Sequence, residues 1–123
     1  RRTAEIAQAH GKPFVVHMGG PARRLLPLLA QAGISGVEGI AGPPQGDATL
    51  SEAREAAGAG LTLWGGIPQD YLLAERTEAE FEAAVQEAVE QARGAGSVLL
   101  GVADRVPVDA EWSRLKRLSA LIS

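Results

Sequence analysis

The sequence predicts an α/β fold made of four consecutive strand–helix units with parallel strands. Short runs of β-branched and apolar residues alternate four times with helical patterns, and glycine or proline interrupts the chain between them. Consecutive strands joined by helices run parallel. A parallel sheet is covered on both faces, and a closed (β/α)8 barrel needs about 250 residues. The 123 residues therefore predict a single domain, residues 1–123, that is half of such a barrel. A small doubly wound sheet with helices on both sides is the alternative.

The first half of the chain shows two of these units. A strand is predicted over 13–18, ended by two glycines, and the tail of a helix over 3–9 precedes it. Closely spaced leucines predict a helix over 24–32, in which Pro27 fits because the first turn has free N–H groups. The second strand is predicted over 34–40.

Capping boxes mark the starts of the next two helices. A Thr-x-x-Glu pattern begins at Thr49 and another at Thr77, which predicts helices that run to about Ala57 and to Gly94. The third strand is predicted over 61–64, where Gly65 and Gly66 stop it. A loop is predicted over 41–47 and a fourth strand over 97–102. A last helix follows, capped by Asp109, with an apolar side expected to face inward: Trp112, Leu115, Leu118 and Ile122.

Composition excludes several classes of function. The net charge is −3 and no basic run is interleaved with aromatic residues, which argues against nucleic-acid binding. No apolar stretch approaches the roughly 20 residues that span a bilayer. Cysteine is absent, so disulfides and thiolate metal ligands are excluded. These features fit part of a cytoplasmic enzyme that acts on a small molecule.

Four segments carry a resemblance to a known family. They are His17-Met18-Gly19-Gly20, Leu25-Leu26-Pro27-Leu28-Leu29 with Gly33, Leu63-Trp64-Gly65-Gly66-Ile67 and Ala103-Asp104-Arg105-Val106-Pro107. In order and spacing they resemble the C-terminal half of the uroporphyrinogen-decarboxylase superfamily barrel. That superfamily includes porphyrinogen decarboxylases, corrinoid-dependent methyltransferases and cobalamin-independent methionine synthases. The resemblance implies a site at the C-terminal mouth of the barrel.

The chain departs from each branch of the superfamily. The decarboxylases carry Gly-Asn-x-Asp-Pro where this chain has the residues from Gly65 to Gln69, and a histidine near the end of the fourth strand. The methyltransferases carry His-x-Cys at the first strand end and bind zinc, whereas Gly19 stands in place of that cysteine here. Glu38 and Asp104 lie near other ligand positions of the methionine-synthase relatives. On these differences the chain resembles the methyltransferase branch with an altered ligand set.

Three polar residues lie at the ends of different predicted strands, where a barrel would bring them into one pocket. His17, Glu38 and Asp104 could together bind a divalent metal such as zinc, manganese or iron. Without a metal, they could act as acid–base groups, with His17 and Asp104 as the catalytic pair. The opposing interpretation is structural: His17 hydrogen-bonds a neighbour, Glu38 faces solvent and Asp104 pairs with Arg105.

Further residues are candidates for substrate binding. Arg24, and Arg23 beside it, follow His17 and could bind a carboxylate, or could simply be solvated. The Trp64 indole could stack on a flat substrate such as a corrinoid or tetrapyrrole, or could fill the core. Gly65 and Gly66 would let a ligand approach the backbone closely.

Three functions remain open on the sequence. The first is metal-assisted methyl transfer, and the second is cofactor-free decarboxylation of a porphyrinogen in haem biosynthesis. The third is a non-catalytic half-barrel that self-associates through its unpaired strand edges. In the first two cases the chain would act as part of a full barrel, paired with a missing half, and would be inactive alone.

Overall fold

A computed structural model describes residues 1–122 of the chain. Its elements alternate as predicted, and their bounds are as follows: α1 Arg2–Ala9, β1 Val15–His17, α2 Leu26–Gln31, β2 Gly36–Ile40, α3 Leu50–Ala57, β3 Thr62–Ile67, the 3₁₀ turn η1 Gln69–Leu72, α4 Glu78–Gly94, β4 Val98–Val102 and α5 Trp112–Leu121. The sheet order is β1-β2-β3-β4, and every neighbouring pair is parallel. The predicted series of parallel strand–helix units is confirmed.

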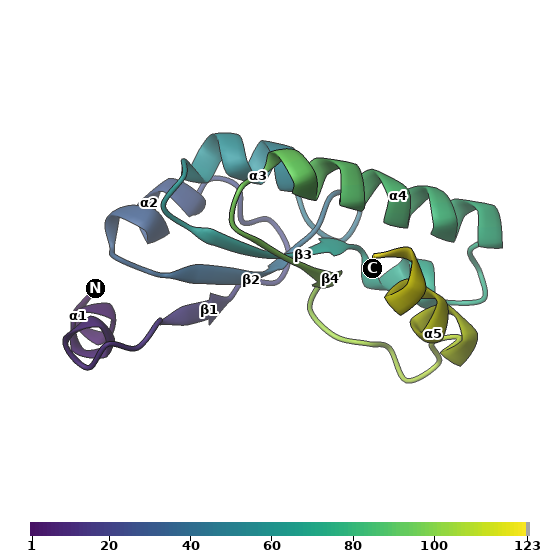
Figure 1. Ribbon diagram of the computed structural model, residues 1–123, viewed down its shortest axis with the longest axis horizontal. Coiled ribbons are helices and arrows are strands. Elements are labelled where there is room, and N and C mark those ends of the chain that lie inside the picture. The colour runs from purple at the N-terminus through teal and green to yellow at the C-terminus, as the bar shows by residue number, and fades with distance from the viewer. Residues whose placement is uncertain (123) are drawn as a thin grey trace.

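The helices that follow the first three strands all cover the same face of the sheet. Figure 1 shows α2, α3 and α4 along that face, with α1 beside β1 and α5 beyond β4. A doubly wound sheet would carry helices on both faces. The arrangement is instead that of a barrel wall, with its helices outside and its inner face open.

The helix-covered face forms the hydrophobic core. Val37 and Leu63 on the central strands are fully buried, and both pack in one cluster with Leu50 and Ala53 of α3. A second cluster joins the end of β3 to α4 and α5 through Ile67, Leu72, Phe81, Val85, Ala88 and Leu118. Burying apolar area in this way is the main stabilising term of the fold.

Both predicted capping boxes are present. The Thr49 hydroxyl accepts the N–H of Glu52 while the Glu52 carboxylate accepts the N–H of Thr49, and Thr77 with Glu80 repeats the pattern. The carboxylates also lie at the positive ends of the two helix dipoles. The hydrogen bonds from the Thr49 and Thr77 N–H groups hold the pKa of Glu52 and of Glu80 below their usual values.

The start of α5 differs from the prediction. Its N-cap is Glu111, not Asp109, and no side chain caps it. Trp112 and Ile122, expected to face inward, are exposed, and only Leu118 of the predicted apolar set is buried. The Glu111 N–H is instead bonded to the Leu72 carbonyl, which anchors the chain two residues later than an Asp109 cap would.

The third strand is longer than predicted, because its two glycines continue the strand instead of ending it. β3 runs to Ile67, and Gly66 pairs with Gly101 of β4. Gly65 has φ 137° and a Cβ there would lie 2.3 Å from the Ile40 carbonyl oxygen, so no larger residue fits. Glycine is therefore required by the close approach of β2, which propensity alone does not reveal.

Candidate functional site

The face of the sheet opposite α2, α3 and α4, called here the inner face, carries the predicted polar residues. One row of in-register residues crosses four strands: His17 pairs with Glu38, Glu38 with Trp64, and Trp64 with Leu99. In-register neighbours in a sheet are about 4.8 Å apart. The row therefore places an imidazole, a carboxylate and an indole side by side on adjacent strands.

Glu38 joins the other two members of the predicted site. One of its oxygens, Oε2, lies 2.5 Å from Nδ1 of His17, and the other, Oε1, accepts the backbone N–H of Asp104 at 3.0 Å. The second ring nitrogen of His17, Nε2, lies 3.5 Å from Oδ1 of Asp104. The structure thus brings together all three residues that the sequence placed at strand ends. The interpretation that Glu38 only faces solvent does not describe this geometry.

A bulge in β2 accompanies Glu38. The pairing with β3 shifts register between Glu38 and Ile40, where Gly39 adopts φ 100°. A Cβ at Gly39 would lie 2.7 Å from the Met18 carbonyl oxygen, so glycine permits the close packing against β1. Bulges bend a strand and redirect its side chains. This one lies immediately after the carboxylate that holds His17.

Asp104 adopts an unusual backbone conformation at the end of β4. Its φ is 69°, and among residues 1–122 it is the one non-glycine residue with positive φ. Aspartate tolerates this region better than most residues, and the Glu38 carboxylate accepts the N–H that the turn exposes. No ion pair links Asp104 to Arg105 within the described chain, contrary to the structural interpretation of the sequence.

The charges around His17 favour its protonated form. The hydrogen bond that His17 donates to Glu38 raises the pKa of His17 above the ordinary 6.5, and the charges of Glu38 and Asp104 add to the effect, while partial desolvation opposes it. The side chain is 54% exposed, so these interactions are screened by water. Protonation of His17 would place a hydrogen on each ring nitrogen, facing a carboxylate on either side.

The same geometry does not fit a metal centre. A metal ion needs ligand atoms that converge on one point, whereas the two carboxylates approach opposite nitrogens of the His17 ring. Within residues 1–122 no cluster of three or more histidine, cysteine, aspartate or glutamate side chains has an arrangement suited to a metal ion. The predicted ligands are neighbours, but their oxygens are directed at His17 and at the Asp104 N–H.

The predicted substrate-binding residues lie in different environments. Trp64 is 42% exposed on the inner face, so it is not the core residue of the alternative interpretation. Its indole Nε1 lies 3.9 Å from the position of a Cβ on Gly101, so the ring extends toward β4. Arg24 is exposed, and no hydrogen bond or ion pair in the described chain involves it, whereas Arg23 pairs with Glu52.

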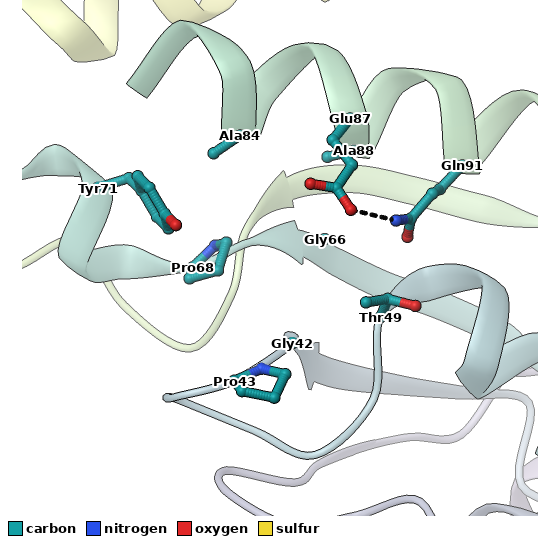
Figure 2. Close-up of a pocket in the computed structure, with 10 residues that line it drawn as sticks. All are labelled: Gly42, Pro43, Thr49, Gly66, Pro68, Tyr71, Ala84, Glu87, Ala88 and Gln91. Atoms are coloured by element: carbon teal, nitrogen blue, oxygen red, sulfur yellow. Dashed lines mark hydrogen bonds between the residues drawn. The ribbon is translucent and has the colours of Figure 1, made fainter. Parts of the chain in front are cut away.

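The space beside Gly66 is largely filled by protein. A Cβ at Gly66 would lie 2.7 Å from Leu50 and 3.0 Å from Leu100. Gly66 also borders a pocket of about 240 Å³ on the helix-covered side, shown in Figure 2 between the β2–α3 loop and α4. The Glu87–Gln91 hydrogen bond crosses one wall of that pocket. Neither His17, Glu38 nor Asp104 lines it, so this pocket is separate from the site that these three residues form, called here the ionic site.

A second pocket lies closer to the ionic site. It has a volume of about 380 Å³ between η1 and the segment after β4. Arg105, the neighbour of Asp104, forms part of its wall together with Val106, Pro107 and Val108.

The β2–α3 loop holds polar residues that the sequence did not single out. Asp47 Oδ1 accepts the N–H groups of Ala22 and Arg23 at 2.8 and 3.0 Å. The Gln45 side chain bonds the backbone of the segments after β3 and β4. Glycine and proline marked this segment as a loop, but loop composition does not indicate which polar side chains reach across to other strands.

The structure resembles part of a larger known protein. A methyltransferase from Methanosarcina mazei aligns with 98% of this chain at a TM-score of 0.73 and 20% sequence identity. The alignment covers 34% of that protein, so this chain spans about a third of its length. No family model matches the sequence. No curated protein matches it either. No helix within residues 1–122 has the length and apolar character to cross a membrane. The chain therefore has an α/β fold of four parallel strand–helix units that matches about a third of a larger methyltransferase.

Proposed function

We propose that this chain forms part of a methyl-transferring barrel of the uroporphyrinogen-decarboxylase type, in which His17 accepts a proton from the methyl acceptor. One observation supports this proposal above the others. Glu38 binds both the Nδ1 side of His17 and the backbone of Asp104, which leaves Nε2 of His17 directed at an exposed carboxylate on the inner face. The fold similarity to a methyltransferase supports the same reaction class.

The proton transfer follows from the hydrogen bonds. In neutral His17, the Glu38 carboxylate holds the hydrogen on Nδ1, so the lone pair is on Nε2. An acceptor X–H that approaches Nε2 beside the Asp104 carboxylate gives its proton to Nε2. The electron pair of X then forms the bond to the methyl carbon, and the pair of the breaking bond leaves with the methyl donor. Glu38, and to a lesser extent Asp104, stabilises the imidazolium that results, as the raised pKa of His17 indicates.

Charge favours methyl transfer over the decarboxylase alternative. A porphyrinogen carries several carboxylates, and Glu38 and Asp104 would repel them on the inner face. Arg24, the residue expected to bind such a carboxylate, lies exposed on the turn before α2 and has no partner within residues 1–122. A neutral or cationic acceptor suits the inner face better than a polyanion does.

The remaining parts of the proposed site come from the inner face. Trp64 lies in the same row as Glu38 and offers an exposed aromatic surface to the substrate or to a flat corrinoid donor. The apolar inner-face residues Val15 and Leu99 are also exposed. We propose that further strand–helix units, or a second copy of the chain, cover this face.

An assay with methylcobalamin and a small thiol, run on the complete barrel of which this chain is proposed to form part, tests the proposed reaction. Replacing His17 by Asn should lower kcat by about 10²- to 10⁴-fold, the range typical for loss of a general base. His10→Asn is the matched control, because His10 only bonds the Ile6 carbonyl in α1. Equal activity in His17→Asn and wild type would contradict the proposal, as would the absence of thiol methylation by the wild type.

Activity measured after treatment with a chelator distinguishes acid–base catalysis from a metal-assisted mechanism. We expect activity to survive treatment with EDTA, because the carboxylates are directed at opposite nitrogens of His17. Loss of activity on EDTA treatment and recovery on adding zinc, manganese or iron would instead assign His17, Glu38 and Asp104 to a metal. That result would require His17 to turn away from Glu38.

A further inference from the structure

The loop between β2 and α3 connects the C-terminal ends of all four strands. Its Asp47 accepts two backbone N–H groups from the segment after β1. Its Gln45 accepts the N–H of Gln69, after β3, at 2.8 Å and donates to the carbonyl of Ala103, after β4, at 3.2 Å. The loop therefore connects segments that lie beyond the last paired residues of β1, β3 and β4.

The hydrogen bond from Gln45 to Ala103 lies next to Asp104, the candidate catalytic residue that follows β4. Ala103 is fully buried and its N–H is bonded to the Ile67 carbonyl at 2.8 Å. Its carbonyl accepts the hydrogen bond from Gln45, so both the N–H and the carbonyl of Ala103 are bonded. Asp104 follows directly, at φ 69°, and its N–H is bonded to Glu38. The unusual turn that directs the Asp104 carboxylate toward His17 starts from an anchored residue.

The loop is built to present Gln45 at this place. A Cβ at Gly46 would lie 2.2 Å from the Ala41 carbonyl oxygen, so the residue after Gln45 must be glycine for the loop to close in this form. The Gly46 N–H also bonds the Gly42 carbonyl at 3.1 Å. A side-chain amide can donate to one backbone carbonyl and accept from one backbone N–H at the same time.

We propose that Gln45 is a positioning residue for the His17–Glu38–Asp104 site, which rests on the function proposed above for His17. Its amide joins the ends of β3 and β4 and keeps the Asp104 turn at the distance where the carboxylate faces Nε2 of His17. The Gln45 side chain hydrogen-bonds only backbone groups in the described chain, so we assign it a role through Asp104 and not on substrate.

Amide hydrogen exchange of the protein tests this role directly. Gln45→Ala removes both bonds, and we expect the Asp104 and Gln69 amides to exchange about ten-fold faster, the effect of losing roughly one hydrogen bond from the closed state. Gln45→Glu keeps the acceptor for Gln69 and loses the donor to Ala103. In that variant we expect fast exchange at Asp104 and near-normal exchange at Gln69.

Two further readouts separate positioning from a general structural effect. The ring ¹⁵N resonances of His17 should shift in both Gln45 variants, and kcat for thiol methylation should fall. Gln91→Ala is the control, since Gln91 bonds only Glu87 within α4, and it should leave the His17 resonances in place. Gln45→Met, which keeps the side-chain volume, replaces Gln45→Ala if the latter does not fold.

The outcomes distinguish this proposal from the proposed reaction. Unchanged Asp104 exchange and unchanged His17 resonances in Gln45→Ala and Gln45→Glu would overturn the positioning role, whatever the activity. Altered exchange and resonances in a protein whose methyl transfer is insensitive to His17→Asn would support the positioning role and contradict the reaction.

Discussion

The two faces of the same four-stranded sheet differ in almost every physical property. On the helix-covered face, Val37 and Leu63 are fully buried among leucines and alanines of α3 and its neighbours. On the inner face, one residue further along the same strands, Glu38 and Trp64 contact water. Side chains alternate between the faces with a period of two. Along each strand, the residues that stabilise the fold therefore alternate with residues that are candidates for function.

The division explains why the inner face can hold three polar groups close together. A carboxylate buried among leucines would cost several kcal/mol unless it were fully paired. Glu38 avoids that cost, because it lies on the open face and bonds both His17 and the Asp104 N–H. The apolar face needs no such partners and is packed instead. Folding thus depends on the covered face while the open face is free to carry function.

A matched pair of leucine substitutions measures the contrast between the faces, and its expected effect is the largest. Leu63→Ala should lower the free energy of unfolding by about 2–5 kcal/mol, because a fully buried leucine leaves a cavity. Leu99→Ala on the adjacent strand removes a side chain that is 52% exposed and should cost less than about 1 kcal/mol. Urea denaturation followed by circular dichroism gives both values.

An equal cost for the two leucine variants would break the comparison. In the chain of residues 1–123 by itself, it would mean that a second copy already covers Leu99 in solution. A midpoint of denaturation that rises with protein concentration would then identify the second copy as the cover.

The one charged residue buried in the described chain provides a second, smaller test, at the packing of α5 against η1 and α4. Arg114 bonds Glu78 at 2.7 Å and the carbonyls of Tyr71 and Arg76 at 2.9 and 2.6 Å, and a further bond reaches the Leu73 carbonyl. Arg114→Met should destabilise the protein by about 2–3 kcal/mol, since hydrogen bonds to charged groups are worth that much.

Arg117→Met serves as the matched control for Arg114. Arg117 lies on the same helix and pairs with Glu82, but its side chain is mostly solvated. Exposed ion pairs contribute less than about 1 kcal/mol. Thermal melting of both variants should therefore separate them clearly, and similar melting temperatures would show that the Arg114 contacts do not stabilise the packing of η1 against α5.

The sequence predicted the order of elements because each carries a local pattern. The capping boxes at Thr49 and Thr77 and the glycines between units locate the helices within a few residues. Asp109 failed as a cap, since a backbone bond from Glu111 to Leu72, far away in sequence, sets the start of α5. Long-range contacts of this kind leave no local signal.

The candidate site was predictable in membership but not in geometry. Strand ends at one edge of a parallel sheet brought His17, Glu38 and Asp104 together as expected. Which atoms face one another depends on the bulge at Gly39 and on the positive φ of Asp104. Neither feature follows from strand patterns, and together they direct the carboxylates at His17 instead of at a shared metal position.

The pKa of His17 is the most direct measure of the central claim, that Glu38 and Asp104 hold this imidazole as an acid–base group. A pH titration followed by NMR should give a value above 6.5 in the wild type, because the Glu38 hydrogen bond stabilises the charged ring. Since a raised folded-state pKa stabilises the protein below the unfolded value, this contribution should be present below pH 6.5 and disappear as the pH rises through the folded pKa. Glu38→Gln should lower the pKa of His17, while Glu87→Gln on α4 should leave it unchanged. A wild-type pKa at or below 6.5, or one that Glu38→Gln does not lower, would contradict the account.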